Sequence, residues 1–313
     1  MTRTERPVAP KVAVLMTCHN RRAQTLAALA SLHGQTGLPP GTSLTVHLVD
    51  AGSTDGTGAA VRAAFPATDV VGAGPDVYWG TGTAMAAARA DPGAHVLWLN
   101  DDVVLSANAL AVLLHTAAPL RRASVVVGAM LSADGGRTTY GGYRLRPGRW
   151  RPPRLERVEP DPRRALACDS CNGNAVLVTR AARRALGDLD PAFPHRMGDS
   201  DYGLRARRAG IPVLLAPGHV GVCDDHQPFA PGTSRAPGIT VRTALRRATS
   251  VREQPLGPWW RFCRRHFGVW SPLLFCSPYA RTFVTAMWGR RSPAGGVPAP
   301  PPPSPVTTDH LPL

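Results

Sequence analysis

Residues 95–102 read HVLWLNDD, a mostly apolar run that ends in an amide and two carboxylates. Such a run, bounded by turn residues, is typical of a buried strand that ends at a polar edge. Two further runs have the same form: Val12–Met16 is followed by TCHN, and Leu44–Val49 is followed by Asp50. We therefore predict strands whose ends carry polar side chains.

Helical spacing follows each of these strands, and Asp69–Val71 adds another short strand of the same kind. The predicted helices are Ala23–His33, a segment that ends near Ala64, Thr83–Ala90 and Ala107–Ala117. Alternating strands and helices imply right-handed crossovers, so we predict an α/β fold with a mainly parallel, Rossmann-like sheet covered by helices. Ligands bind such sheets beyond the carboxyl ends of the strands, where these polar residues fall.

The second half of the chain has a less regular pattern. The predicted strands are Ser124–Met130, Ala175–Val178 and Val213–Ala216, and the predicted helices are Arg180–Leu186 and Asp199–Ala209. The Gly-, Arg- and Pro-rich residues up to Ala167 predict irregular structure. Seven prolines in the thirteen positions from Pro293 to Pro305 predict an extended, disordered tail.

The composition is that of a folded chain with a basic C-terminal part. Hydrophobic residues make up 43% and charged residues 18%, which excludes a disordered acidic chain. The formal net charge is +15, and the residues from Arg235 onward carry eleven arginines against two acidic residues. This excess suits phosphates or an anionic membrane surface.

No run of about 18 uncharged apolar residues is present, and the N-terminal MTRTERPVAPK lacks an apolar signal core. We expect a cytoplasmic protein, or one held peripherally at the inner face of the membrane. Six cysteines spread along a chain without a secretory signal predict free thiols.

Aromatic residues alternate with arginines between Leu256 and Arg291. This pattern suits a membrane interface with anionic lipid. It equally suits stacking on single-stranded nucleic acid, or a pair of amphipathic helices packed on the rest of the chain. The sequence leaves all three interpretations open.

Asn100, Asp101 and Asp102 can hold a hard divalent cation together with a diphosphate, because Mg²⁺ and Mn²⁺ favour oxygen ligands. The alternative is a turn between a strand and a helix.

Four motifs, in order, resemble those of a family 2 glycosyltransferase with the GT-A fold. They are TCHNR at 17–21, DAGSTDG at 50–56, WLNDD at 98–102 and GDSDYGLR at 198–205. The resemblance covers roughly residues 11–230. Within the family it is closest to the rhamnosyltransferase-like branch, on the strength of Asn100-x-Asp102 and the aromatic-Gly element YWGTG at 78–82.

The resemblance implies roles for individual residues. Those expected to bind the nucleotide sugar are Thr17, His19, Asn20, Arg21, Asp50, Ser53, Trp79, Gly80, Asn100 and Asp101. Asp102 and His226 would bind the metal, with His219 as the alternative histidine. Gly173, Asn174 and Asp201 would lie on the acceptor side. For Asp50, a purely turn-forming role remains open.

Asp199 matches the carboxylate that the family uses as general base. Such a base removes a proton from the acceptor hydroxyl, and a dry site or a neighbouring carboxylate would raise its pKa. The alternative is helix-start chemistry, with Asp199 as the cap and Asp201 paired with Arg205 one turn later.

A structural zinc site is a competing interpretation of the cysteines. Cys168, Cys171, Cys223 and His226 form a Cys₃His set.

The resemblance also implies a division of the chain. We expect a flexible N-terminus (1–10), a catalytic domain (11–234), a helical basic and aromatic extension (235–291) and a disordered Pro-rich tail (292–313). Within the catalytic domain, 11–130 would bind the nucleotide sugar and 131–234 the acceptor.

The implied activity is inverting transfer of a sugar from a nucleoside diphosphate to a hydroxyl acceptor, assisted by Mg²⁺ or Mn²⁺. A dTDP-rhamnose or UDP-sugar donor and a cell-wall, polysaccharide or lipid-linked glycan acceptor are expected, with an anionic membrane surface as a partner and no nucleic acid. The alternative function is nucleic-acid or membrane binding through the basic C-terminal segment.

Overall fold

The computed structural model describes residues 9–120, 122–148, 151–224 and 231–288. His226, the Pro-rich tail and most of the predicted flexible N-terminus lie outside the described residues. All six cysteines lie within them and are free, as predicted.

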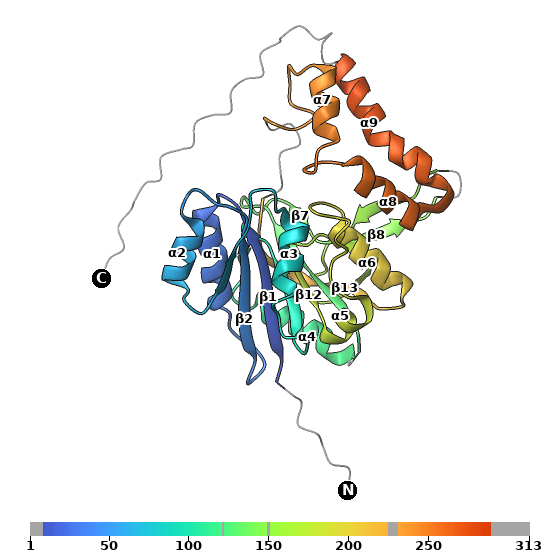
Figure 1. Cartoon of the computed structure of the whole chain (residues 1–313). Coiled ribbons are helices and arrows are strands. Elements are labelled where there is room, and N and C mark those ends of the chain that lie inside the picture. Colours follow the sequence, from blue (N-terminus) through green and yellow to red (C-terminus); the bar gives the residue numbers. More distant parts are fainter. Residues whose placement is uncertain (1–8, 121, 149–150, 225–230, 289–313) are drawn as a thin grey trace.

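A mixed, mainly parallel sheet forms the centre of the molecule (Figure 1). In spatial order its strands are β10 (Leu166–Cys168), β13 (Val213–Val222), β6 (Val125–Leu131), β12 (Ala175–Val178), β4 (His95–Leu99), β1 (Lys11–Cys18), β2 (Ser43–Asp50) and β3 (Asp69–Gly72). The strands from β4 to β3 are parallel, and β12 is inserted antiparallel between β4 and β6. At its edges β5 (Val104–Leu105) pairs with β13, and β7 (Thr138–Tyr140) pairs with β6.

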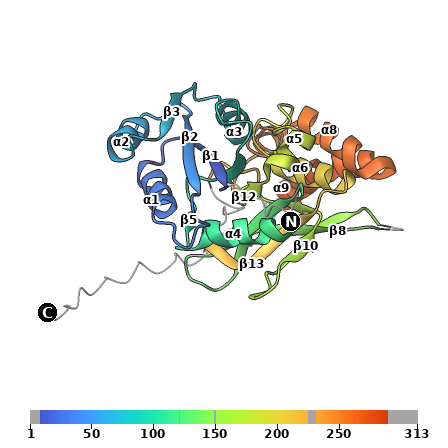
Figure 2. The same ribbon diagram turned by 90° about the horizontal axis from the view of Figure 1, so that it is seen from below.

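Helices cover both faces of this sheet (Figure 2). Alternate side chains of β1 point to opposite faces, so Val14 packs with one layer and Leu15 with the other. The first layer holds α1 (Arg22–His33), α2 (Thr57–Ala64) and α4 (Ala109–Ala117). The second holds α3 (Trp79–Ala87), α5 (Arg180–Leu186) and α6 (Gly198–Arg208). The α/β prediction is therefore confirmed.

Three details differ from the sequence-based prediction. Helix α3 begins at Trp79 instead of Thr83, because the close approach of Gly80 to the carbonyl of Phe193 and the hydrogen bond from Thr81 N to Pro194 O, 3.0 Å, hold this turn against its neighbour. Strand β13 runs on to Val222, since its continuation pairs with β5 and β6.

The stretch predicted to be irregular contains a second sheet. It has the order β11 (Ser170–Cys171), β8 (Gly142–Arg146) and β9 (Arg154–Arg157). Strands β8 and β9 form a local hairpin, whereas β11 pairs with β8 from further along the chain. The strands are short and charged, so they have no periodic apolar pattern from which they could be predicted.

The C-terminal helices lie together beyond α6 and β8 (Figure 1). They are α7 (Val241–Ala248), α8 (Leu256–Phe267) and α9 (Ser271–Trp288), and both α7 and α8 pack on α9. Phe262 and Phe267 of α8 are buried with Phe193 and Leu204, which come from the part of the chain before the C-terminal helices. The predicted helical extension is thus present, and α8 is a packing helix.

No helix among the described residues has the length and apolarity needed to cross a bilayer.

Candidate active site

The ends of β1 and β4 bring the first predicted site residues together. The parallel register pairs Leu15 with Trp98, so Thr17 lies opposite Asn100 two residues later. Thr17 Oγ1 and Asn100 Oδ1 are buried and have no hydrogen-bond partner among the described residues. The Thr17 hydroxyl lies under Gly82 of α3, where a Cβ would overlap it. Buried oxygens without partners need an explanation, and a ligand at this edge would supply one for Asn100.

Arg21 holds the two carboxylates that follow β4. Its Nη1 donates to Asp101 Oδ1 at 3.1 Å and to Asp102 Oδ2 at 2.6 Å. Burial raises the pKa of Asp101 to about 6, and the charge of Asp102 adds to this, while Arg21 acts in the opposite direction. The pair is therefore a partly buried anionic site that carries its own counter-ion.

Cys223 completes the surroundings of Asp102. Its thiol donates to Asp102 Oδ1 at 3.6 Å and accepts from Asn174 Nδ2 at 3.6 Å. Burial raises the pKa of this thiol well above its ordinary value, and Asp102 raises it further. Cys223 is thus a neutral donor to Asp102, a role that the sequence did not reveal because 121 residues separate them.

The loops after β1 and β2 are joined by hydrogen bonds. His19 Nδ1 donates to Ala51 O at 2.7 Å, and the backbone N–H of Asn20 donates to Ser53 Oγ at 2.9 Å. Asn20 has a φ of 51°, a left-handed conformation that asparagine tolerates. Asp50 Oδ1 accepts from Ser53 N at 2.9 Å, so its turn-forming role is present in the structure. These four predicted nucleotide-binding residues form one loop surface.

Trp79 connects α3 to the acceptor-side residues. Its ring lies edge-on to Trp98 of β4, with centroids 6.2 Å apart, and packs directly on Gly173, where a Cβ would overlap the ring. A glycine at position 173 is therefore required by packing.

Asp199 lies on the other side of Gly173. Its Oδ2 accepts from Gly173 N at 2.8 Å and its Oδ1 accepts from Ser200 N at 2.7 Å. Burial raises the pKa of Asp199, although these N–H groups lower it. The capping residue of α6 is Met197, with a left-handed φ of 74°, so Asp199 is in the first turn and is not the cap.

Two hydrogen bonds, linked through the adjacent residues Gly173 and Asn174, connect the backbone of Asn100 at the end of β4 to Asp199. Asn100 N donates to Asn174 O at 3.0 Å, and the adjacent Gly173 N donates to Asp199. The structure therefore brings Asn100, Gly173, Asn174 and Asp199 into one connected site.

Asp201 points away from this site and anchors α8. Its side chain is 0% exposed, and it accepts from Arg205 at 2.8 Å, as the sequence predicted. It also accepts from Arg265 and His266 of α8, both at 2.8 Å. Burial raises the pKa of Asp201, but the hydrogen bonds from His266, Arg265 and Arg205 outweigh it and lower the pKa. The acceptor-side role of Asp201 stays a prediction, and the contacts of its side chain among the described residues are with Arg205, Arg265 and His266.

Of the two histidines predicted as alternative metal ligands, the structure describes only His219. His226 lies outside the described residues. His219 Nε2 lies 2.9 Å from Thr138 Oγ1, and that hydroxyl donates to Glu159. Among the described residues, no group of three or more His, Cys, Asp or Glu side chains could hold a metal ion.

The described cysteines give no support to the zinc interpretation. Cys168, Cys171 and Cys223 have separate hydrogen-bond acceptors, namely Leu166 O, Asp199 O and Asp102 Oδ1.

Tyr143 is another residue near this site that sequence reasoning missed. Its hydroxyl donates to Asn172 Oδ1 at 2.7 Å, next to Gly173. It lies on β8, inside the segment that was predicted to be irregular.

Comparisons with known proteins bear on the family and the fold of the chain. Residues 9–255 match the family model described as "Glycosyltransferase like family 2". No match was found among curated protein sequences. The mannosyltransferase PcManGT from Pyrobaculum calidifontis, solved with GDP-Man and Mn²⁺, superposes with a TM-score of 0.51 at 17% identity, covering 93% of this chain and 77% of that one.

S. aureus TarS is a second structural neighbour. It superposes with a TM-score of 0.53 at 12% identity, and the alignment covers 88% of this chain but 55% of that protein. Its fragment 1–349 in complex with UDP gives a TM-score of 0.52 at 11% identity, covering 90% and 91% of the two chains. Likenesses at such identities show a shared fold.

Proposed function

The chain belongs to glycosyltransferase family 2 and has the GT-A fold, and on this premise we propose that it is an inverting enzyme with Asp199 as its general base. The observation that carries the proposal is the hydrogen-bonded chain from Asn100 through Asn174 and Gly173 to Asp199. It connects the edge where ligands bind parallel sheets to a carboxylate whose pKa is raised by burial.

The proposed step is a single displacement at the anomeric carbon of the donor sugar. The acceptor hydroxyl oxygen forms a bond to this carbon while the bond from the carbon to the diphosphate oxygen breaks. The hydroxyl proton passes to the Asp199 carboxylate, and the bonding electron pair leaves with the diphosphate. Attack from the face opposite the leaving group inverts the configuration.

The residues at the end of β4 fit a hard divalent cation. Asp102 supplies a carboxylate, and the buried Asn100 Oδ1 lacks a partner among the described residues. Both are oxygen donors of the kind that Mg²⁺ and Mn²⁺ favour. A bound cation would offset the charge that develops on the departing diphosphate.

Arg21 would change partners when the donor binds at the carboxyl end of β4. In the structure its guanidinium pairs with both Asp101 and Asp102. A diphosphate at the strand ends offers Arg21 an alternative anion, which would free Asp102 Oδ2 for the metal. His19, Asn20, Asp50 and Ser53 would form the floor of the nucleotide pocket, and Trp79 and Gly80 its acceptor-facing wall.

The donor is proposed to be a UDP-sugar or dTDP-rhamnose, and the acceptor a cell-wall, polysaccharide or lipid-linked glycan. The rhamnosyltransferase-like element at 78–82 supports rhamnosyl transfer. The UDP complex of TarS 1–349 and the GDP-Man complex of PcManGT support a nucleotide-sugar donor in general. The cytoplasmic location stays a prediction.

Nucleotide release distinguishes these donors. The purified chain is incubated with UDP-, dTDP- and GDP-sugars in Mg²⁺ or Mn²⁺, and nucleoside diphosphate is measured. We expect release from UDP- or dTDP-sugars, and its loss in EDTA and in Asp102→Ala. Absence of release from every donor, with metal and a glycan acceptor present, contradicts the proposal.

A further inference from the structure

The exposed large apolar side chains of the described residues gather on the C-terminal helices. Apart from Val104 and Val222, they all lie between residues 256 and 288. They are Leu256, Trp260, Val269, Leu273, Phe283, Val284, Met287 and Trp288. Isolated surface apolar residues are ordinary, but a contiguous group of them marks an interaction surface.

Helix α9 carries an exposed apolar stripe. Leu273, Cys276, Ala280, Val284 and Met287 are all exposed and recur at intervals of three or four residues, so they share one face of the helix. Leu273 is 53% exposed and Met287 is 48% exposed. The face between them contains no charged residue.

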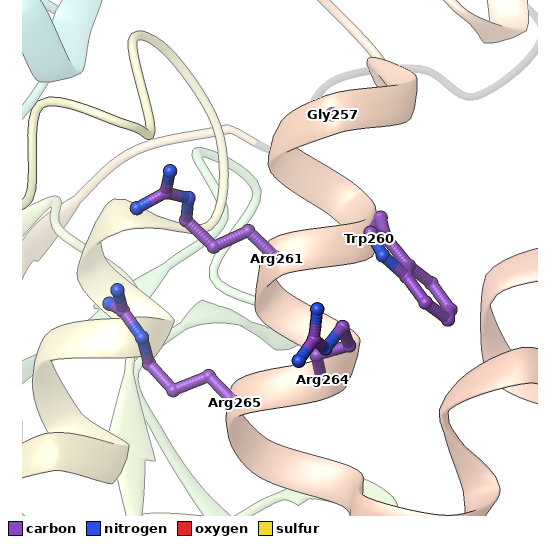
Figure 3. A pocket seen from close by; sticks show the side chains of 5 residues that line it. All are labelled: Gly257, Trp260, Arg261, Arg264 and Arg265. Carbon is purple, nitrogen blue, oxygen red and sulfur yellow. The ribbon is translucent and has the colours of Figure 1, made fainter.

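Helix α8 adds a mixed apolar and cationic face. Leu256, Trp260 and Arg264 are spaced by four residues and exposed, and Arg261 lies beside them. Figure 3 shows Arg261 and Arg265 extending to one side of α8 and Trp260 to the other. A cavity of about 500 Å³ is lined by Gly257, Trp260 and the three arginines.

An apolar groove joins the two helices. It has a volume of about 510 Å³ and is lined by Leu256, Gly257, Trp260, Pro272, Phe275 and Cys276. Gly257 and Trp260 line both this groove and the arginine-lined cavity. Apolar and cationic surfaces are thus continuous at Trp260.

The charges on this surface are all of one sign. Residues 254–288 contain four arginines and no Asp or Glu. Arg265 is paired with Asp190 and Asp201, whereas Arg261, Arg264 and Arg281 form no ion pair with any described residue. The unpaired cations give this surface a positive potential, which favours an anionic partner.

We propose that α8 and α9 bind the surface of an anionic lipid bilayer, with the α9 stripe and Trp260 in the headgroup region and the unpaired arginines Arg261 and Arg264 on lipid phosphates. Amphipathic helices with apolar and basic faces lie in this way at the membrane interface. This proposal concerns the location of the protein and does not depend on which sugar it transfers.

Other occupants of this surface fit less well. A second copy, paired through the same surface by two-fold symmetry, would bring arginines against arginines with no carboxylate to separate them. Single-stranded nucleic acid would use aromatic platforms; Trp260, Phe283 and Trp288 are exposed, but the continuous stripe along α9 is aliphatic. Lipid is the partner that matches both chemistries.

The surface is fixed rigidly to the catalytic part. Arg265 and His266 of α8 bond to the buried Asp201, which is two residues from Asp199 on α6. A bilayer bound by α8 and α9 would therefore hold α6 at a constant orientation, and a membrane-borne acceptor would meet a fixed base.

Flotation of the full chain with vesicles tests the proposal. At about 50 mM salt, we expect it to float with phosphatidylcholine vesicles that contain 30% phosphatidylglycerol and to remain below with pure phosphatidylcholine. Arg261→Glu/Arg264→Glu should weaken partitioning by at least about 30-fold, since each arginine near an anionic surface contributes about 1 kcal/mol, or about fivefold. Val284→Glu/Met287→Glu should also abolish flotation.

The charge-matched control is Arg180→Glu/Arg184→Glu on α5, because both of these side chains are exposed. It should float within about twofold of the parent chain, and all variants should keep their unfolding midpoints. Failure of the parent to float overturns the proposal, as does an equal loss in the α5 control. A dimer that Val284→Glu/Met287→Glu converts to a monomer, or RNA binding that replaces flotation, overturns it in favour of those partners.

Discussion

The backbone N–H of Gly173 donates to the carboxylate of Asp199 at 2.8 Å, and the Trp79 ring packs on the same glycine. One residue thus joins the aromatic element of α3 to the acidic first turn of α6. Because Gly173 precedes Asn174, which accepts from Asn100 N, the position of Asp199 is coupled to the strand end that carries Asp101 and Asp102.

Substitution of Gly173 by alanine should uncouple these elements. A Cβ at 173 would overlap the Trp79 ring, and overpacking of this kind costs about 1–3 kcal/mol. We expect a lower unfolding midpoint and a fall in kcat, measured by thermal unfolding and nucleotide release. Gly72→Ala is the matched control, since a Cβ there meets no atom within 4 Å. Equal behaviour of the two variants would refute the coupling.

Replacement of Asp102 should remove metal-dependent nucleotide binding. We expect Asp102→Ala to lose the thermal stabilisation that UDP or dTDP with Mn²⁺ gives the parent chain. Asp101 still pairs with Arg21 in this variant, so the ligand-free midpoint should change little. Full activity of the parent in EDTA would contradict a metal requirement.

Asp201 should act on stability more than on chemistry. Removing one partner of a buried ion-pair network costs about 3–5 kcal/mol, so Asp201→Asn should lower the unfolding free energy by about that amount. Asp188→Asn is the control, because its pair with Arg183 is partly exposed and should contribute less than about 1 kcal/mol. A large fall in kcat with little loss of unfolding free energy in Asp201→Asn would instead support a catalytic role.

The same variant predicts a pH dependence. The pKa of Asp201 is lowered in the folded state, so its stabilisation is present above the unfolded pKa of about 4 and is lost as pH falls through the folded value. The difference in unfolding free energy between the parent and Asp201→Asn should therefore be constant near pH 7 and shrink below pH 4. Denaturant titrations at several pH values measure it, and a difference that grows on acidification would contradict the account.

The sequence predicted those elements whose pattern of apolar and polar residues lies within one short stretch of chain. The apolar runs that end at Thr17, Asp50 and Asn100 sufficed for the sheet edge, because the carboxyl ends of parallel strands meet at one edge. The Asp201–Arg205 pair was also predictable from local sequence, since residues four apart share a helix face.

Long-range contacts made the remaining features unpredictable. The early start of α3 depends on Pro194, more than 100 residues away, and the Cys223–Asp102 hydrogen bond on an equally distant strand. Asp201 was placed on the acceptor side by the family resemblance alone, and its ion pairs with Arg265 and His266 of α8 could not be predicted from the sequence. No periodic pattern encodes such pairs.

The central claim is that Asp199 removes the acceptor proton. Each oxygen of its carboxylate accepts a different backbone N–H, so Asp199→Asn turns an amide group toward one of them and should cost about 1–2 kcal/mol of stability. Assays well below the unfolding midpoint separate that cost from catalysis.

The most direct measurement is kcat of Asp199→Asn beside its donor affinity, obtained by calorimetry with a non-transferable donor analogue and Mn²⁺. Loss of a general base typically lowers the rate by about 10² to 10⁴, so we predict a fall in kcat of that size with donor affinity within about threefold of the parent. The parent's kcat/KM should also rise with pH through a value above the ordinary pKa of an aspartate, because burial raises the pKa of Asp199. Near-normal turnover by Asp199→Asn would contradict the account.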